Sequence, residues 1–100
     1  MAKYLTDTMG TNAVFRALAD PTRREILRLL RGGSKSSGDI AGHFETSWAT
    51  VSRHLSILRD AGLIRADRDG QFIHYELNTT VFQDVIDHLL ELGRPRRPHA

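Results

Sequence analysis

The sequence predicts a mainly α-helical domain with a two-stranded β-hairpin followed by one further helix, because the period of its apolar residues changes along the chain. Up to Gly62 the apolar residues recur at helical spacing. Ile73, Tyr75 and Leu77 then alternate with polar or outward neighbours, which is the two-residue period of a strand. Asp69-Gly70, between two extended runs, is a strong hairpin signal.

Length and composition limit the classes of protein to consider. A chain of 100 residues has the usual size of one domain, and its modest core makes dimerisation a natural way to gain stability. The absence of cysteine excludes disulfides and thiolate metal sites. No apolar run approaches the ~18 residues that span a bilayer, and residues 1–11 lack the apolar core of a signal peptide. We therefore expect a cytoplasmic protein with no membrane partner.

The domain is expected to occupy residues 11–92, after a loose N-terminal segment at 1–10 and before a basic, disordered tail at 93–100. Its first helix is expected to begin at Thr11-Asn12. Asp20-Pro21, an N-cap followed by proline at the first helical position, starts a second helix that runs to about Arg31. Ser36 followed by Asp39 resembles a capping box and starts a short third helix.

The segment from Ser47 to Gly62 predicts a fourth helix with two different faces. Ser47 is a good N-cap, and Gly62 suits the left-handed residue that closes a helix. Val51, Leu55 and Leu58 fall at i, i+4 and i+7 and form one apolar face. The opposite face is small, polar and cationic near the helix start, as a helix that enters a DNA major groove requires. An ordinary amphipathic helix with a solvated outer face is the alternative.

The third and fourth helices, joined by a tight turn, form a predicted helix-turn-helix, and the hairpin that follows is a predicted wing. On the fourth helix, Arg53 can reach O6 and N7 of guanine, and the Ser52 hydroxyl can reach a base edge. His54 is equally well explained by helix packing, and Trp48 by covering the turn. The expected DNA contacts of this helix are Trp48, Ala49, Thr50, Ser52, Arg53 and His54.

Further DNA contacts are expected at the start of the third helix and on the wing. Free backbone N–H groups at a helix start, next to a lysine, favour a phosphate contact. Arg68 lies at the wing tip, although Asp67 and Asp69 beside it repel phosphate. The residues expected at these two places are Lys35, Ser36, Ser37, Arg68 and Gln71.

The second helix carries four arginines. Charge runs of this kind usually form a solvated face with internal ion pairs, and Glu25 is an available partner. We expect this arrangement for Arg23, Arg24, Arg28 and Arg31.

A last helix is expected from Val81 to about Leu92, capped by Asn78, Thr79 or Thr80. It has more apolar residues than one domain face needs, which indicates a subunit interface shared with the first helix. The expected dimer contacts are Val14, Phe15, Leu18, Val81, Phe82, Val85, Ile86, Leu89 and Leu90.

Several motifs occur in a fixed order: FRALADPTR at 15–23, TVSRHL at 50–55, LRDAGLI at 58–64, and Gly70-Gln71 with Tyr75 and Leu77. Together they resemble the ArsR/SmtB-type winged-helix repressors of bacteria, over roughly residues 12–92. The resemblance implies four helices, a two-stranded wing and a fifth helix. It also implies a homodimer through the first and last helices, and repression by binding an operator palindrome.

Many members of that family are metal sensors. One well-known sensor site of the family is a Cys-Val-Cys motif in the third helix. That site is absent here, because the third helix carries no thiol. Asp84 and His88 share one face of the last helix and could bind zinc across a dimer seam. A polar pair at the rim of an interface is the preferred explanation, so we expect no metal and no cofactor. The segment from Gly70 to Asp84 most resembles the metal-independent, sporulation-delay repressor type of autorepressor.

The sequence contains no nucleophile motif, no glycine-rich phosphate loop and no credible pair of catalytic carboxylates, so we expect no enzyme activity. The hypothesis is a homodimeric repressor that binds double-stranded DNA at an inverted repeat, its own promoter being one candidate. Two alternatives stay open. One is a repressor of the same fold that responds to a metal or small ligand, and the other is a winged helix used as a protein-interaction module.

Overall fold

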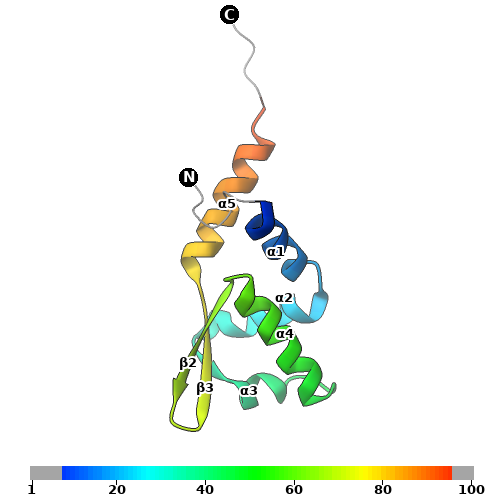
Figure 1. Cartoon of the computed structure of the whole chain (residues 1–100), viewed down its shortest axis with the longest axis vertical. Helices are drawn as coiled ribbons and strands as arrows, with labels where there is room; N and C mark the ends of the chain where they lie inside the picture. Colours follow the sequence, from blue (N-terminus) through cyan, green and yellow to red (C-terminus); the bar gives the residue numbers. More distant parts are fainter. Residues whose placement is uncertain (1–7, 96–100) are drawn as a thin grey trace, which may run out of the picture.

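A computed structural model describes residues 8–95 of the chain. Its elements follow the order α1 (Thr8–Leu18), α2 (Pro21–Leu29), the 3-10 helix η1 (Leu30–Gly32), β1 (Lys35–Ser36), α3 (Ser37–Ala41), α4 (Trp48–Asp60), β2 (Ile64–Asp69), β3 (Phe72–Leu77) and α5 (Thr79–Gly93) (Figure 1). The predicted fold class, mainly α with a β-hairpin wing, is confirmed.

The element boundaries differ from expectation in a few places. α1 begins at Thr8, so the last part of the segment expected to be loose is helical. Residues 1–7 and 96–100, which include most of the predicted tail, lie outside the described residues. The second helix ends at Leu29 and continues as the tighter η1 turn.

The helix starts follow the predicted capping chemistry. Asp20 Oδ1 accepts hydrogen bonds from the backbone N–H groups of Thr22 and Arg23, at 2.8 and 3.1 Å. Ser36 and Ser47 each accept one from the N–H three residues on, at 3.1 and 3.2 Å. These bonds satisfy donors that have no partner within the helix and so fix where α2, α3 and α4 begin. α5 begins without a side-chain cap.

The hairpin belongs to a three-stranded antiparallel sheet with the order β1-β3-β2. β2 and β3 pair from Ile64 opposite Leu77 to Asp69 opposite Phe72. The turn is therefore Gly70-Gln71, one residue later than predicted, and Gly70 takes the left-handed φ of 62° that favours glycine. β1, which the sequence did not predict, places its two residues beside the other edge of β3.

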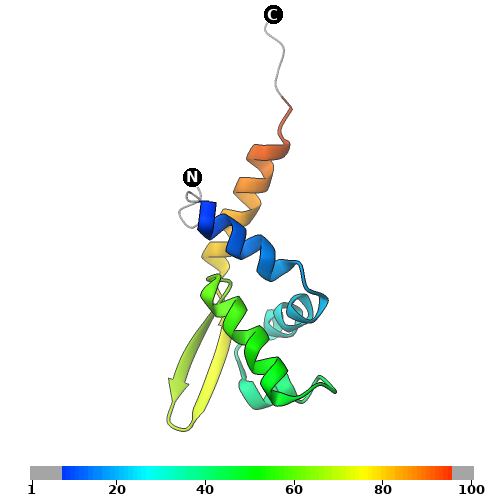
Figure 2. The same cartoon turned by 45° about the vertical axis from the view of Figure 1, so that its right-hand side comes forward.

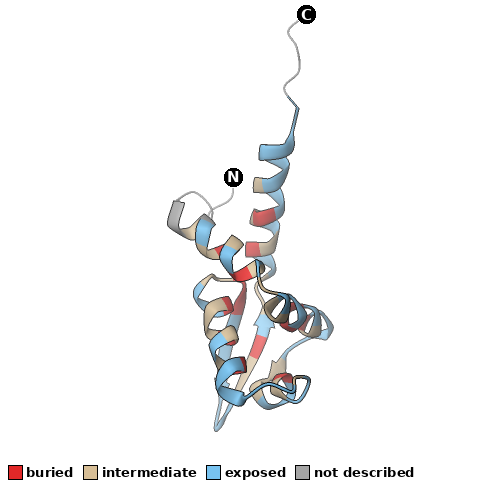
Figure 3. Ribbon diagram, turned by 90° about the vertical axis from the view of Figure 1, so that its right-hand side faces the viewer, coloured by how far each residue is buried: buried red, intermediate tan, exposed pale blue. Residues whose placement is uncertain are grey.

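The core lies where α1, α2, α3 and α4 meet the base of the hairpin and the first turns of α5. Figures 1 and 2 show the rest of α5 extending away from this body. Figure 3 shows buried positions near the start of α5 and exposed positions towards its end. The exposed large apolar residues of this part are Ile86, Leu89, Leu90 and Leu92.

The expected dimer residues therefore divide into two groups. Val14 and Val81 are 1% and 0% exposed within a single protomer, so they belong to its own core and offer almost no surface to a second copy. Val85 is also buried, and Phe15, Leu18 and Phe82 are partly buried against the core. A helical apolar pattern shows that a residue is on the apolar side, but it does not show which neighbour covers that side.

Candidate nucleic-acid interface

α4 presents the outer face that the sequence predicts. Val51, Leu55 and Leu58 are buried, so the helix is anchored by one side. Trp48 is 54% exposed, and Ala49, Thr50 and Arg53 are exposed beside it, while Ser52 and His54 are partly buried. The start of α4, the short α3 and the tip of the hairpin all lie towards one end of the molecule, opposite the C-terminal end of α5 (Figures 1 and 2).

The first turn of α4 is held by two hydroxyl groups. Ser47 Oγ accepts from the Thr50 backbone N–H, and the two side-chain oxygens lie 2.9 Å apart in a second hydrogen bond. Thr50 was expected to contact DNA, and the structure gives it this local partner. Its hydroxyl therefore helps to fix the start of the helix that carries the other expected contacts.

A side chain of α2 connects α4 to the end of α1. Arg23 donates from Nε to the Ala17 carbonyl at 2.8 Å and from Nη2 to the Arg16 carbonyl at 3.0 Å. Its Nη1 lies 3.2 Å from His54 Nδ1. Because a guanidinium can only donate, His54 accepts with Nδ1, which leaves the ring proton of the neutral form on Nε2. The expectation that Arg23 lies on a solvated face is wrong, and this contact favours the helix-packing explanation of His54.

The other arginines of α2 and η1 are closer to expectation. Arg28 forms the predicted ion pair with Glu25, at 2.9 Å, and Arg31 is exposed. Arg24 is exposed as well, but it donates to the Leu18 carbonyl at 2.9 Å. Two arginines of α2 thus donate to carbonyl groups in the last turn of α1, where the helix itself supplies no donor to Ala17 and Leu18. The Arg16 carbonyl also accepts from the Ala19 backbone N–H, at 3.2 Å.

Asp20 occupies the junction between α1 and α2. The backbone N–H of Arg23 lowers the pKa of this carboxyl from its ordinary value of 3.8, because the bond favours the charged form. The Thr22 N–H and the Arg23 guanidinium act in the same direction, while burial opposes them. The carboxylate form of Asp20 is therefore the one that the folded chain stabilises.

The residues before α3 and on the wing lie apart from α4 in the chain but belong to one sheet. Lys35 pairs with Tyr75 across β1 and β3, and Ser36 both pairs with His74 and caps α3. On the hairpin, Arg68 and Gln71 are exposed, and within residues 8–95 Arg68 forms no ion pair. The neighbouring cation Arg65 differs, because it lies 3.1 Å from Glu76.

Phe72, which is not among the expected DNA contacts, is 65% exposed beside the wing turn. The alternation along β3 contains the signal, since Phe72 falls on the side opposite Ile73 and Tyr75. An exposed aromatic ring at a wing tip adds an apolar contact surface to the polar one formed by Arg68 and Gln71.

The two candidate metal ligands on α5, Asp84 and His88, do not belong to a cluster of metal-binding side chains within residues 8–95. The His88 ring lies 6.1 Å from the Phe15 ring, centroid to centroid. Asp84 Oδ2 is buried without a hydrogen-bond partner in the described part of the chain. Within residues 8–95 no three histidine or acidic side chains form a cluster that could hold a metal ion.

In the same residues no helix is long and apolar enough to cross a membrane.

A short helix, a turn, an outward-facing second helix and a hairpin placed directly after it define a winged helix-turn-helix protein. Residues 20–66 match the family described as bacterial regulatory protein, arsR family. The chain is 56% identical over 79 residues to the transcriptional repressor SdpR of Bacillus subtilis (strain 168). The aligned region covers 79% of this chain and 88% of that protein. The chain belongs to the ArsR family, as its sequence motifs predict.

Solved structures agree with this assignment. A crystal structure of an ArsR family transcriptional regulator superimposes with a TM-score of 0.79 at 30% identity, over 97% of this chain and 100% of the other. The solution NMR structure of a homodimeric winged helix-turn-helix DNA-binding domain from Mycobacterium bovis has a TM-score of 0.68 at 25% identity, over 91% and 89% of the two chains. The family and the fold identify the chain as a DNA-binding transcriptional regulator rather than an enzyme.

Proposed function

We propose that the chain is a homodimeric repressor that binds an inverted-repeat operator in double-stranded DNA. The observation that carries the proposal is the outward face of α4, on which Trp48, Ala49 and Arg53 are exposed while the opposite face is buried. The similar Bacillus subtilis protein is named a transcriptional repressor, and the similar Mycobacterium bovis domain is described as homodimeric. Both descriptions support the same activity for this chain.

In the proposed complex the N-terminal half of α4 enters the major groove. Arg53 donates two hydrogen bonds to guanine O6 and N7, and Ser52 contacts a neighbouring base edge. Trp48 and Ala49 supply apolar contact to a thymine methyl group. Thr50 and His54 contribute by holding α4 in position, because their polar atoms already contact Ser47 and Arg23.

Phosphate contacts surround this reading helix. Lys35 and Ser37 approach the backbone beside the start of α3, where Ser36 holds the helix N-terminus in place. Arg68 and Gln71 on the wing contact the flanking backbone or minor groove, and Arg68 is available for that role because it forms no ion pair within residues 8–95. These contacts position the protein, and the base contacts of α4 provide its sequence preference.

The dimer is proposed to form through α5. Ile86, Leu89, Leu90 and Leu92 leave 49–68% of their surface exposed on a helix that extends beyond the core. Such a contiguous apolar surface is typical of a subunit interface. A two-fold dimer places two copies of α4 in successive major grooves, so the half-sites are expected one helical turn, ~34 Å, or a multiple apart.

The test is selection of bound duplexes from a random DNA pool by the full-length chain, followed by binding to the DNA upstream of its own gene. The proposal predicts an inverted repeat and a steep decrease of affinity with salt. Binding of all duplexes alike, or a monomeric protein without DNA affinity, contradicts it. The second outcome is the one expected for a winged helix that serves as a protein-interaction module.

A further inference from the structure

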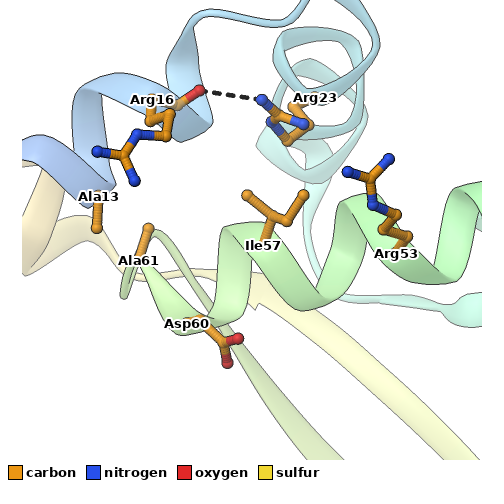
Figure 4. Close-up of a pocket in the computed structure, with 7 residues that line it drawn as sticks. All are labelled: Ala13, Arg16, Arg23, Arg53, Ile57, Asp60 and Ala61. Carbon is orange, nitrogen blue, oxygen red and sulfur yellow. Dashed lines mark hydrogen bonds between the residues drawn. The ribbon is translucent and has the colours of Figure 1, made fainter.

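A pocket of about 370 Å³ lies between α1, α2 and α4, on the flank of the proposed reading helix. Figure 4 shows that three arginine side chains, Arg16 from α1, Arg23 from α2 and Arg53 from α4, surround it. Its volume falls within the range of small-molecule sites, ~300–1,000 Å³. The pocket therefore combines ligand-sized space with a concentration of positive charge.

The positive charge of the pocket is not balanced from inside. The guanidinium groups of Arg16 and Arg53 form no hydrogen bond or ion pair with any residue in the described range 8–95. Asp60 is the one carboxylate in the lining, but it lies 3.6 Å from Arg59 and points away from the two arginines in Figure 4. An anion in the pocket would thus find donors that are still available.

Arg23 supplies a rigid wall to this pocket. Its bonds to the Ala17 and Arg16 carbonyls hold the guanidinium in one orientation before any ligand arrives. Neither carbonyl neutralises the guanidinium charge. A fixed cation of this kind attracts an anion without the entropic cost of ordering a long side chain.

The remaining lining is apolar. Ile57 lies between the arginines in Figure 4, and Ala13 and Ala61 close the end of the pocket near Arg16. All three are partly buried, and the two alanines leave room that larger side chains would fill. A DNA phosphate gains nothing from contact with these apolar side chains, whereas an acid with an apolar body buries that body against them.

We propose that this pocket binds a small organic carboxylate with an apolar body, and that the bound acid reduces DNA affinity. The carboxylate accepts from Arg53, and the apolar body lies along Ile57 towards the two alanines, where the unpaired charge of Arg16 adds to the positive potential of the pocket. The second part rests on the proposed function: Arg53 is the residue assigned to guanine, so a ligand that holds its guanidinium competes with the operator.

The binding test is an NMR titration of the full-length chain with octanoate, with 1-octanol and acetate as controls that lack the charge or the apolar chain. We expect saturable shifts of the Ala13, Ile57 and Ala61 amide signals with octanoate alone. Arg16→Gln is expected to weaken octanoate binding several-fold, because it removes one unpaired positive charge from the lining of the pocket. The matched control, Arg31→Gln, removes an exposed arginine outside the pocket and is expected to change nothing.

The competition test measures operator binding in octanoate and in acetate at equal ionic strength. Octanoate is expected to weaken DNA binding by the wild-type chain, and Arg16→Gln is expected to bind DNA normally but lose this response. Octanoate binding by a chain with no DNA affinity would contradict the proposed function and leave the pocket assignment intact.

Three results would overturn the pocket assignment. The first is equal shifts with 1-octanol, and the second is octanoate shifts confined to the exposed face of α5. The third is an Arg16→Gln variant with weaker, less salt-dependent DNA binding in a protein that does not bind octanoate, because this result assigns the pocket to a DNA phosphate.

Discussion

Replacing Arg23 by methionine tests the link between α1, α2 and α4. The substitution keeps an unbranched apolar side chain in place of the aliphatic part of arginine but removes the donors that reach Ala17 O at 2.8 Å and Arg16 O at 3.0 Å. A hydrogen bond with a charged partner contributes ~1.5–3 kcal/mol. Water replaces part of this contribution, because Arg23 is only partly buried and the bond to Arg16 is exposed. We expect the free energy of unfolding to fall by about 2 kcal/mol.

The assay is urea unfolding followed by circular dichroism, at one fixed protein concentration because dimerisation raises apparent stability. In a thermal scan the same loss corresponds to a decrease in Tm of roughly 10 °C. Arg24→Met is the matched control, since Arg24 makes one exposed bond to the Leu18 carbonyl at 2.9 Å, and we expect it to cost less than about 1 kcal/mol. Equal stability of the two variants would refute the role assigned to Arg23.

Three further predictions concern the cap, the dimer and the wing. Because folding lowers the pKa of Asp20, its charge stabilises the chain above pH 3.8 and loses this effect as the pH falls through the lower folded value. Urea unfolding across this range should therefore show a smaller pH dependence for Asp20→Asn than for the wild type. Leu89→Glu places a charge on the exposed apolar face of α5 and should yield monomers in sedimentation experiments, whereas Asp87→Glu should not. Arg68→Ala should weaken binding to all duplexes alike and reduce the slope of log K against log salt by ~1; an unchanged slope would exclude a phosphate contact.

Much of the fold could be predicted from the sequence because its determinants are local. Asp20, Ser36 and Ser47 cap the helices that they were expected to cap, and each bond spans at most three residues. Gly62 and Gly70 take the positive φ values that a helix end and a hairpin turn require. The outward face of α4 follows from the helical spacing of its apolar residues.

The features that were missed depend on contacts between distant parts of the chain. β1 has two residues, too few for a period, and it exists because Lys35 meets Tyr75. Arg23 looked like one charge in a run, and its role depends on where the end of α1 and His54 lie in the folded chain. The pocket beside Arg53 is invisible in sequence for the same reason, since its three arginines come from three helices.

The measurement that tests the central claim most directly compares Arg53→Ala with Arg31→Ala on the selected operator and on variants of each base pair. If α4 lies in the major groove, Arg53→Ala weakens specific binding by ~1–3 kcal/mol and relaxes the preference at one position in each half-site. Arg31→Ala leaves that preference unchanged. Identical base preferences in the two variants would show that the exposed face of α4 does not read the DNA sequence through Arg53.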